Sequence, residues 1–350
     1  MAYTTIDKPS DYFNTKLTTG TGNSQAVTGL GFQPDWIWGK RRDSTGNHSL
    51  FDAVRGITKG LESNSTGAEF TSTDYYSSFD SNGFTIAAGA SGAGNGSGQT
   101  AVQWCWKAGT SFTNDASSTG IGSIDSTGSV NTDAGFSIVS YTGNGNSGQT
   151  IAHGLGSTVD MVIVKDRSRA GENWVIYHKS LGKDKLLLFN TDAAATSSNY
   201  WGSSTPNSTV FGVKDGNTSN NWSGDNFIAY CFAEKKGYSK FGSYVGTGVD
   251  SGTFSFCGFK PAFVLTKRTD SAGSWVIQDN KRPGYNETSL DLNPNNTEAE
   301  ETNNGIDMLS NGFKQRNTDA HTNASGGNYI FYAVAENPFV TSTGVPATAR

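Results

Sequence analysis

FIAYCFAE, at residues 227–234, has two counterparts elsewhere in the chain: AVQWCWKA at 101–108 and YIFYAVAE at 329–336. Each is a short apolar and aromatic run that follows a turn rich in Gly, Ser and Asn. Internal repeats have to be identified before any other fold assignment, because overlooking them misassigns the whole architecture. Further landmarks recur at nearly constant distances from these three closing runs.

A lysine that ends an apolar run gives the second landmark. It is Lys40 in PDWIWGK, Lys165 in VDMVIVK and Lys267 in PAFVLTK. The fifth residue of the closing run follows this lysine by 65, 66 and 66 residues in the three copies. The Asn that ends LESN, LLFN and LDLN follows it by 24, 25 and 26 residues. Two spacings that agree this closely predict a triplicated unit.

The repeat divides the chain into segments of about a hundred residues, which is an ordinary domain size. The predicted organisation is an N-terminal attachment arm at 1–17, module one at 18–109, a linker at 110–134, module two at 135–236, module three at 237–339 and a C-terminal tail at 340–350.

Composition and turn chemistry favour strands over helices. Gly contributes 44 residues and aromatic residues 12%, while charged residues reach only 16%. Short β-branched and aromatic runs alternate with polar turns, and Ser81-Asn82-Gly83 is a strong hairpin signal that Ser310-Asn311-Gly312 repeats. A propeller blade of about 45 residues would be half as long as this repeat. The predicted fold is all-β, with three tandem antiparallel β-sandwich modules of jelly-roll or lectin-like style behind an N-terminal extended arm.

Charge and hydropathy exclude several classes of partner. A net charge of −5 without a basic stripe argues against nucleic acid. The N-terminus has no signal-peptide pattern, and no run of about eighteen apolar residues predicts a membrane span. We expect Cys105 and Cys231, which share one repeat position, to be small buried residues of the core.

No motif in the sequence predicts catalysis. The four histidines show no HxH or HExxH spacing, and neither GxSxG around a plausible nucleophile nor a phosphate-binding loop occurs. The carboxylate groupings Asp74/Asp80 and Glu298/Glu300/Glu301 lie in polar segments typical of solvated loop charges. We expect a non-enzyme without cofactor or metal site. Calcium binding by the oxygen-rich loop 214–221 stays open, although that loop lacks the EF-hand pattern.

Candidate ligand-binding residues lie in the loops that differ most between the copies. Tyr75, Tyr76, Tyr200 and Trp201 stand among hydroxyl and amide residues, which is typical of a platform that stacks against a sugar ring or a protein surface. The alternative is that they cover the cores of their own modules. The lysines and arginines that follow the three landmark strands are interpreted as a basic edge that prevents strand pairing.

Residues 1–17 lie outside the repeat and carry two isolated aromatic residues, Tyr12 and Phe13. Aromatic residues on an extended arm indicate docking, either on the protein itself or on a partner. We predict an assembly arm that attaches the protein to its neighbours.

Several phrases resemble one family. AYTTIDKPSDYFNTKL (2–17), GLGFQPDWIW (29–38), FKPAFVLTKR (259–268), SKFGSYVGTG (239–248) and YIFYAVAENPF (329–339) are similar to repeat proteins of tailed phages of marine bacteria, known as tail-fibre or virion proteins. The resemblance covers nearly the whole chain and implies a structural, receptor-facing part of a phage particle. It carries no catalytic residues.

Three functions follow as expectations. The first is a tail fibre or host-attachment protein, as a homotrimer, that binds a cell-surface glycan or an outer-membrane protein through its variable loops. The second is a decoration protein of the capsid surface or tail wall. The third and weakest is a glycan-cleaving spike, because no carboxylate pair is evident. Each reading places the protein in a virion, bound to other virion subunits through its arm, without nucleic acid or membrane insertion.

Overall fold

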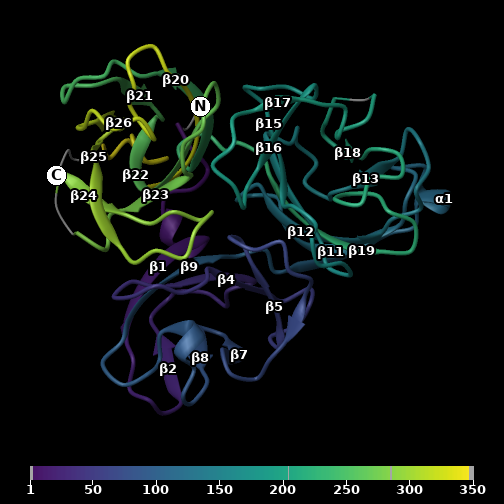
Figure 1. Ribbon diagram of the computed structural model, residues 1–350, viewed down its shortest axis with the longest axis horizontal. Coiled ribbons are helices and arrows are strands. Elements are labelled where there is room, and N and C mark those ends of the chain that lie inside the picture. Colours follow the sequence, from purple (N-terminus) through teal and green to yellow (C-terminus); the bar gives the residue numbers. More distant parts are fainter. Residues whose placement is uncertain (1–2, 204, 284–285, 347–350) are drawn as a thin grey trace.

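The computed structural model describes residues 3–203, 205–283 and 286–346 (Figure 1). Strands account for 43% of the chain, and helical structure in the described part is limited to α1 (Ala116–Thr119) and the 3-10 turns η1 (Pro9–Asp11) and η2 (Ser91–Ala93). The all-β prediction is confirmed. Within the same ranges, no helix is long and apolar enough to span a membrane.

Three sheets, here called the first, second and third inner sheets, form the centre of the molecule. The first has the order β1 (Phe13–Thr19), β9 (Thr100–Trp106), β3 (Trp36–Arg41), β4 (Ser49–Asp52), β5 (Lys59–Glu62), β6 (Phe70–Thr71). The second has the order β10 (Thr110–Asn114), β11 (Ser126–Asn131), β12 (Phe136–Thr142), β19 (Asn226–Phe232), β14 (Met161–Asp166), β15 (Val175–His178), β16 (Lys185–Leu188), β17 (Thr196–Ser197). The third has the order β20 (Ser239–Val245), β27 (Asn328–Pro338), β22 (Phe259–Arg268), β23 (Val276–Asp279).

Three further sheets, here called outer sheets, complete the described strands. The first has the order β2 (Gln25–Thr28), β8 (Gly83–Ile86), β7 (Tyr76–Asp80). The second pairs β13 (Thr150–Ala152) with β18 (Val210–Gly212). The third has the order β21 (Phe254–Phe256), β26 (Gly312–Gln315), β25 (Glu301–Leu309), β24 (Thr288–Asp291). All of these ladders are antiparallel.

The inner sheets share a strand order. Each contains an opening strand, then the closing run, then the lysine strand, then the strand that follows it: β1-β9-β3-β4, β12-β19-β14-β15 and β20-β27-β22-β23. Along the closing run β9, Trp104 and Trp106 face the centre of the molecule while Cys105 faces the first outer sheet. Successive side chains of a strand point to opposite faces, so an uninterrupted apolar run fits a strand that is buried on both sides.

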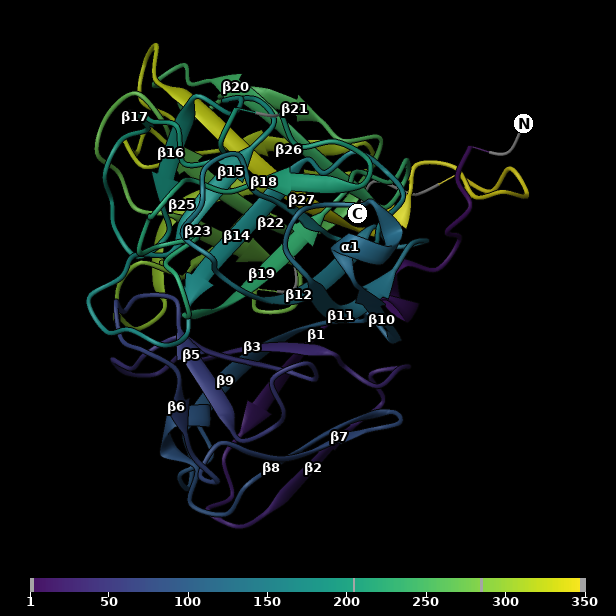
Figure 2. The same ribbon diagram turned by 90° about the vertical axis from the view of Figure 1, so that its right-hand side faces the viewer.

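All three inner sheets contribute to one central core. Trp36 stacks on Tyr230 with ring centroids 4.4 Å apart, Phe232 lies 5.1 Å from Tyr332, and Trp106 lies 5.6 Å from Phe263. Aromatic rings bury large areas and gain further from such contacts. Figure 1 shows the inner sheets meeting at the centre, and Figure 2 shows the first of them beneath the other two. The sheets therefore depend on one another for burial.

Backbone hydrogen bonds connect the segments that follow the three lysine strands to neighbouring sheets in a ring. The carbonyl two residues after each landmark lysine accepts from the residue just before β25 of the third outer sheet, β6 of the first inner sheet or β17 of the second inner sheet: Glu300 N to Arg42 O, Glu69 N to Arg167 O, and Ala195 N to Thr269 O, each 2.9 Å. The backbone N–H six residues after each landmark lysine donates to a carbonyl of the same neighbouring segment: Gly46 to Thr297 O, Gly171 to Thr66 O, and Gly273 to Asp192 O, at 2.8–2.9 Å. Positions related by spacing thus make equivalent contacts.

The described part of the predicted arm, residues 3–17, lies on the protein itself. Phe13 begins β1, which pairs with β9, and its ring is buried in the central core. Thr4 donates to Lys236 O at 2.8 Å, and Tyr12 meets the ring of Tyr238 edge-on at 5.9 Å. These residues therefore dock on the protein itself, which is one of the two alternatives for the arm, and their apolar side chains complete the core. Attachment to a neighbouring subunit stays a prediction. Of the predicted tail at 340–350, the last four residues lie outside the described ranges.

The predicted linker at 110–134 contains regular structure. Its residues form β10, α1 and β11, which extend the second inner sheet outward from β12. Val130 is buried there, whereas the remaining side chains are mostly hydroxyl-bearing. A polar segment can form a strand at the edge of a sheet when a neighbouring strand offers backbone hydrogen bonds, and β12 does so here.

The predicted basic edge is wrong, because the landmark lysines are fully buried in interior strands. Lys40 donates to Thr297 O at 3.3 Å and Lys267 to Asp192 O at 3.1 Å, both across sheet boundaries. Lys165 donates to Glu172 O at 3.0 Å. Burial lowers the pKa of each of these lysines to about 8. They satisfy loop carbonyls where the sheets meet.

Candidate functional site

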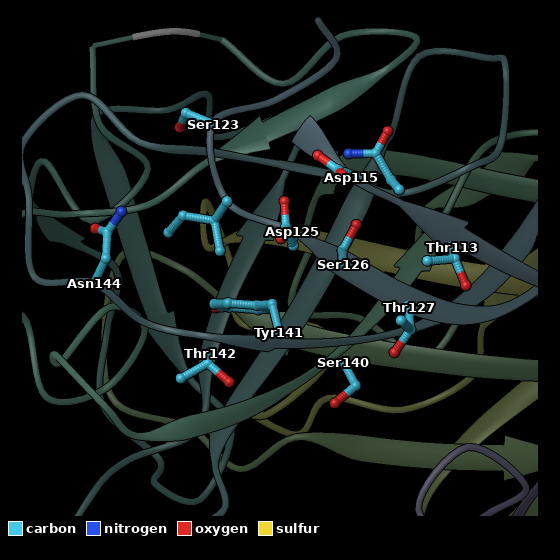
Figure 3. Close-up of a pocket in the computed structure, with 12 residues that line it drawn as sticks. Thr113, Asp115, Ser123, Asp125, Ser126, Thr127, Ser140, Tyr141, Thr142 and Asn144 are labelled. Atoms are coloured by element: carbon cyan, nitrogen blue, oxygen red, sulfur yellow. The ribbon is translucent and has the colours of Figure 1, made fainter. Parts of the chain in front are cut away.

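A polar groove of about 620 Å³ lies on the second inner sheet, where β10 and β11 join β12 (Figure 3). Eight of its twelve lining residues come from the 110–134 segment, and four come from β12 and the turn that follows it. The lining residues are Thr113, Asn114, Asp115, Ser123, Ile124, Asp125, Ser126, Thr127, Ser140, Tyr141, Thr142 and Asn144. The groove thus exists because of a segment that neither of the other two inner sheets contains.

Local hydrogen bonds hold the wall formed by α1. Asp115 caps this helix by accepting from the backbone N–H groups of Ser117 and Ser118 at 3.0 and 3.1 Å. Asp125 accepts from Ala116 N at 2.8 Å, which ties the start of α1 to the strand side of the groove. The hydrogen bonds from Ser117 and Ser118 hold the pKa of Asp115 below its usual value, so its carboxylate is ionised at neutral pH.

The floor of the groove is rigid. Ser126 donates to Ala152 O at 2.9 Å, and the buried hydroxyl of Tyr141 donates to Asn220 O at 2.9 Å. Thr113 and Thr127 also line the groove, and both are exposed (Figure 3). Hydroxyl, amide and carboxylate groups on a fixed frame suit recognition of a ligand that is itself rich in hydroxyl groups.

The carboxylates considered in the sequence lie outside this groove. Glu300 forms ion pairs with Arg42 at 2.7 Å and Arg282 at 3.2 Å, so it is part of a sheet boundary. Asp80 accepts from Thr85 at 2.8 Å, and Asp74 is exposed. In the described ranges, no group of three or more His, Cys, Asp or Glu residues is arranged to hold a metal ion.

Buried histidines and cysteines are structural. His178 contacts Phe331 O at 3.2 Å, and burial lowers the pKa of His153 and His178 to about 4, so both rings are neutral at pH 7. Cys105 and Cys231 are buried free thiols, as predicted, and burial raises their pKa. A buried thiol of raised pKa is a poor nucleophile.

One titratable pair lies at the end of β14. Burial raises the pKa of Asp166 to about 6, and the neighbouring Asp225 carboxylate contributes to the rise. Asp225 also forms an ion pair with Arg169, whose guanidinium lies 4.8 Å from the ring centroid of Trp222. Because Arg169 neutralises Asp225, this arrangement braces the end of β14 and does not resemble an open catalytic pair.

Two of the predicted binding residues lie beside the first outer sheet and face inward. Tyr76 is fully buried and meets the ring of Phe84 edge-on at 5.6 Å. Tyr75 is half-buried and packs on Phe51 and Phe70 at 5.1 and 5.5 Å. The prediction of an exposed aromatic platform is therefore wrong for Tyr76, and Tyr75 mainly covers the core beneath it.

The other two predicted binding residues behave in the same way. Trp201 is fully buried and meets the ring of Tyr177 edge-on at 5.8 Å, so its assignment to an exposed platform is wrong. Tyr200 is half-buried, and Lys214 covers its ring at 5.0 Å. Such rings pack over a module when the sequence around them supplies few aliphatic residues. The structure does not bring these two residues together with Tyr75 and Tyr76 at one site.

The loop considered for calcium is used for bracing. Asn220 Oδ1 accepts from Lys214 N at 3.3 Å, and Asn221 Oδ1 accepts from Asn144 N at 3.1 Å.

Tyr12 lines a second hollow of about 430 Å³ beside Lys107, and Phe13 lies in the core. Sequence reasoning missed the groove, although Asp115 followed by Ala-Ser-Ser is a recognisable helix start.

Comparison with known proteins gives one match. A family model described as a domain of unknown function, DUF7483, matches residues 8–338. Neither a curated protein nor a solved structure matches the chain. Because the family model spans nearly the whole sequence, the protein belongs to the DUF7483 family.

Proposed function

We propose that the protein is a non-enzymatic structural component of a phage particle and acts in host attachment, as a tail fibre or part of one. The carrying observation is the groove on the second inner sheet, with its hydroxyl, amide and carboxylate lining on a rigid frame. These groups suit a glycan of the host surface better than an apolar ligand. The resemblance to tail-fibre and virion proteins supports the assignment to a particle.

We also infer that the chain consists of three tandem copies of an antiparallel β-sandwich, each made of one inner and one outer sheet. The shared strand order of the inner sheets and the equivalent cross-sheet hydrogen bonds support this reading. One chain then has an approximate threefold arrangement by itself. A homotrimer held together in the assembled particle remains part of the proposal, since several copies of a weak groove would bind together through avidity.

Substitution in the groove tests the proposal. Thr127 is exposed on β11, and Thr127→Arg would place a long cationic side chain in the hollow. Thr28→Arg makes the same change on β2, far from the groove, and serves as the matched control. Binding of labelled protein to the host bacterium is expected to fall at least about tenfold for Thr127→Arg and to be unchanged for Thr28→Arg. Equal binding by all three proteins would reject the groove as the receptor site.

Decoration of the capsid surface or tail wall is the second candidate. It is favoured by the docking of residues 3–17 on the protein's own body, which gives a compact particle-surface shape without a projecting arm. Immunogold labelling of intact particles separates the two candidates. Label at the tail tip is required for host attachment, and label over the head or along the tail wall supports decoration.

A glycan-cleaving spike is the weakest candidate. The carboxylates of the groove, Asp115 and Asp125, are both occupied in part by backbone N–H groups of α1. We expect no new reducing ends when the purified protein is incubated with host polysaccharide. Their appearance would revive the enzymatic reading.

A further inference from the structure

The open edge of β21 carries an unusual pattern of side chains. β21 is the first strand of the third outer sheet and pairs with β26 on its other side. Phe254 is 43% exposed and Phe256 59% exposed, whereas Ser255 between them is buried. A sheet with one wet face normally turns its apolar residues inward and its polar residues outward. Here the aromatic pair faces out.

Strand register identifies the same edge in the other outer sheets. Ser255 lies opposite Phe313, as Ile151 lies opposite Phe211 and Val27 opposite Phe84. The positions equivalent to Phe254 and Phe256 are therefore Thr150 and Ala152 in β13, and Ala26 and Thr28 in β2. Only the third outer sheet has two large apolar residues there.

In the second outer sheet, this edge is covered by polypeptide. The carbonyl of Thr150 accepts from the N–H groups of Ser123 and Ile124 at 2.9 and 3.3 Å, and its N–H donates to Ser123 Oγ at 2.8 Å. The carbonyl of Ala152 accepts from Ser126 Oγ at 2.9 Å. The segment that builds the groove thus also satisfies the backbone groups of β13 that face away from β18.

In the third outer sheet, the corresponding backbone groups face outward. Thr253 O accepts from Gln315 N at 3.1 Å and Cys257 N donates to Asn311 O at 2.9 Å, so the odd-numbered residues face β26. Alternation along a strand then turns the N–H and C=O groups of Phe254 and Phe256 to the open side. In the described ranges, no turn, loop or side-chain hydrogen bond reaches the backbone of either residue.

The apolar surface continues onto the neighbouring inner sheet. Val245 at the end of β20 is 54% exposed and Val249 is 52% exposed. Thr253 Oγ1 donates to Val245 O at 2.5 Å, which holds the end of β20 against the start of β21. Both views show the two strands together at the rim of the molecule (Figures 1 and 2). Exposed apolar residues that gather in this way mark an interaction surface.

We propose that this edge pairs with the same edge of a second copy of the chain, about a twofold axis at Ser255. The strand Phe-Ser-Phe is palindromic, so antiparallel pairing sets Phe254 of one copy opposite Phe256 of the other. These are the residues whose N–H and C=O groups face outward, and each such pair exchanges two backbone hydrogen bonds.

Charge also favours a second copy as the occupant. Residues 251–259 include no charged side chain, so a twofold axis at Ser255 brings no like charges together within the strand. Sheet edges that must stay unpaired usually carry charged residues or proline, and β21 carries neither. The edge of β2, with Ala26 and Thr28, lacks the aromatic surface and is not expected to pair.

Sedimentation velocity over a concentration series tests the pairing. The wild-type protein is expected to shift from 37.1 kDa towards twice that mass as its concentration rises. Phe254→Ser/Phe256→Ser should raise the dimer dissociation constant by about tenfold or more. Leu17→Ser, an exposed apolar residue on the edge strand β1, is the matched control and should dimerise like the wild type. Tryptophan fluorescence verifies that each variant is folded.

A disulfide tests the register. Hydrogen-bonded antiparallel pairs hold Cα atoms about 5.5 Å apart, within the range of about 4.4–6.8 Å that a disulfide spans. Phe254→Cys/Phe256→Cys should therefore give a covalent dimer on mild oxidation, whereas Leu17→Cys should not, and the three native thiols are buried. The proposal is overturned if the wild type is monomeric at every concentration. It is also overturned if the wild type forms a dimer that Phe254→Ser/Phe256→Ser does not weaken and Phe254→Cys/Phe256→Cys does not cross-link. Both results are independent of where the protein lies in a particle.

Discussion

Replacing Arg55 by leucine would strand a buried carboxylate between two inner sheets. Arg55 Nε lies 2.6 Å from Asp52 Oδ2, and both side chains are fully buried. Its Nη2 also donates to Leu50 O at 2.9 Å and contacts the hydroxyl of Tyr230, on the second inner sheet, at 3.2 Å. In Arg55→Leu, Asp52 would keep the hydrogen bond from Tyr230 at 2.8 Å but would lose its counter-charge.

Arg55→Leu is expected to lower the free energy of unfolding by about 3–5 kcal/mol, which is the range for removing one partner of a buried ion pair. That is a large share of the roughly 5–15 kcal/mol by which folded proteins are usually stable. The second inner sheet offers an uncharged alternative, because His178 and Leu181 stand where the first has Asp52 and Arg55. His178 contacts Phe331 O, and Leu181 packs on the central core. Asp52→His/Arg55→Leu should therefore recover most of the loss.

Urea denaturation followed by the fluorescence of the eight tryptophans measures these differences. The deficit of Arg55→Leu should be about 3–5 kcal/mol, and that of the double variant should be clearly smaller. A double variant as unstable as Arg55→Leu would refute the reasoning.

Three further outcomes are expected. The pKa of Asp166 is raised to about 6 from 3.8, so the free energy of unfolding of the wild type should fall as the pH rises from about 4 to 6. In urea denaturation, this fall should be about 2–3 kcal/mol smaller in Asp166→Asn than in the wild type. The pKa of Lys165 is lowered to about 8 from 10.5 because burial opposes its charge, so Lys165→Met should be at least as stable as the wild type at pH 7. Between pH 8 and 10.5, the free energy of unfolding of the wild type should rise by about 3 kcal/mol relative to that of Lys165→Met. A variant clearly weaker at pH 7 would contradict this. Removal of residues 1–17 deletes Phe13 and the first five of the seven residues of β1 and should abolish the native circular dichroism spectrum, whereas a folded product would show that this part of β1 is dispensable.

Local patterns in the sequence identified the strands well. The closing runs form the strands β9, β19 and β27, and the runs that end in the landmark lysines form β3, β14 and β22. The predicted hairpin joins β7 to β8, although its two turn residues are Ser81 and Asn82, because Gly83 already belongs to β8 and pairs with Asp80. These features depend on a few consecutive residues, whose backbone preferences and apolar alternation are visible in a single sequence.

Contacts between distant segments were not predictable in the same way. The acceptor of Lys40 is Thr297, 257 residues away in sequence, and nothing near Lys40 indicates that a carbonyl will be available there. Tyr76 and Trp201 looked exposed because polar residues surround them, but burial is decided by the sheet that packs on them. The groove was missed for a related reason. Polar strands such as β10 and β11 form only because β12 offers an edge.

The 110–134 segment explains why the three parts of the molecule can differ in function while they share a core. Substitution in the central core disturbs all three inner sheets at once, since each supplies rings to the others. A segment added beside the opening strand of an inner sheet disturbs only that sheet, because the opening strand has no neighbour on its side away from the closing run. In the second inner sheet, that edge gained two strands, which created a groove and covered β13. In the third, the edge at β20 stayed open, and β21, the edge strand of the third outer sheet, carries the exposed aromatic residues. The rims are therefore where this fold can acquire ligands and partners, and experiments on function belong there.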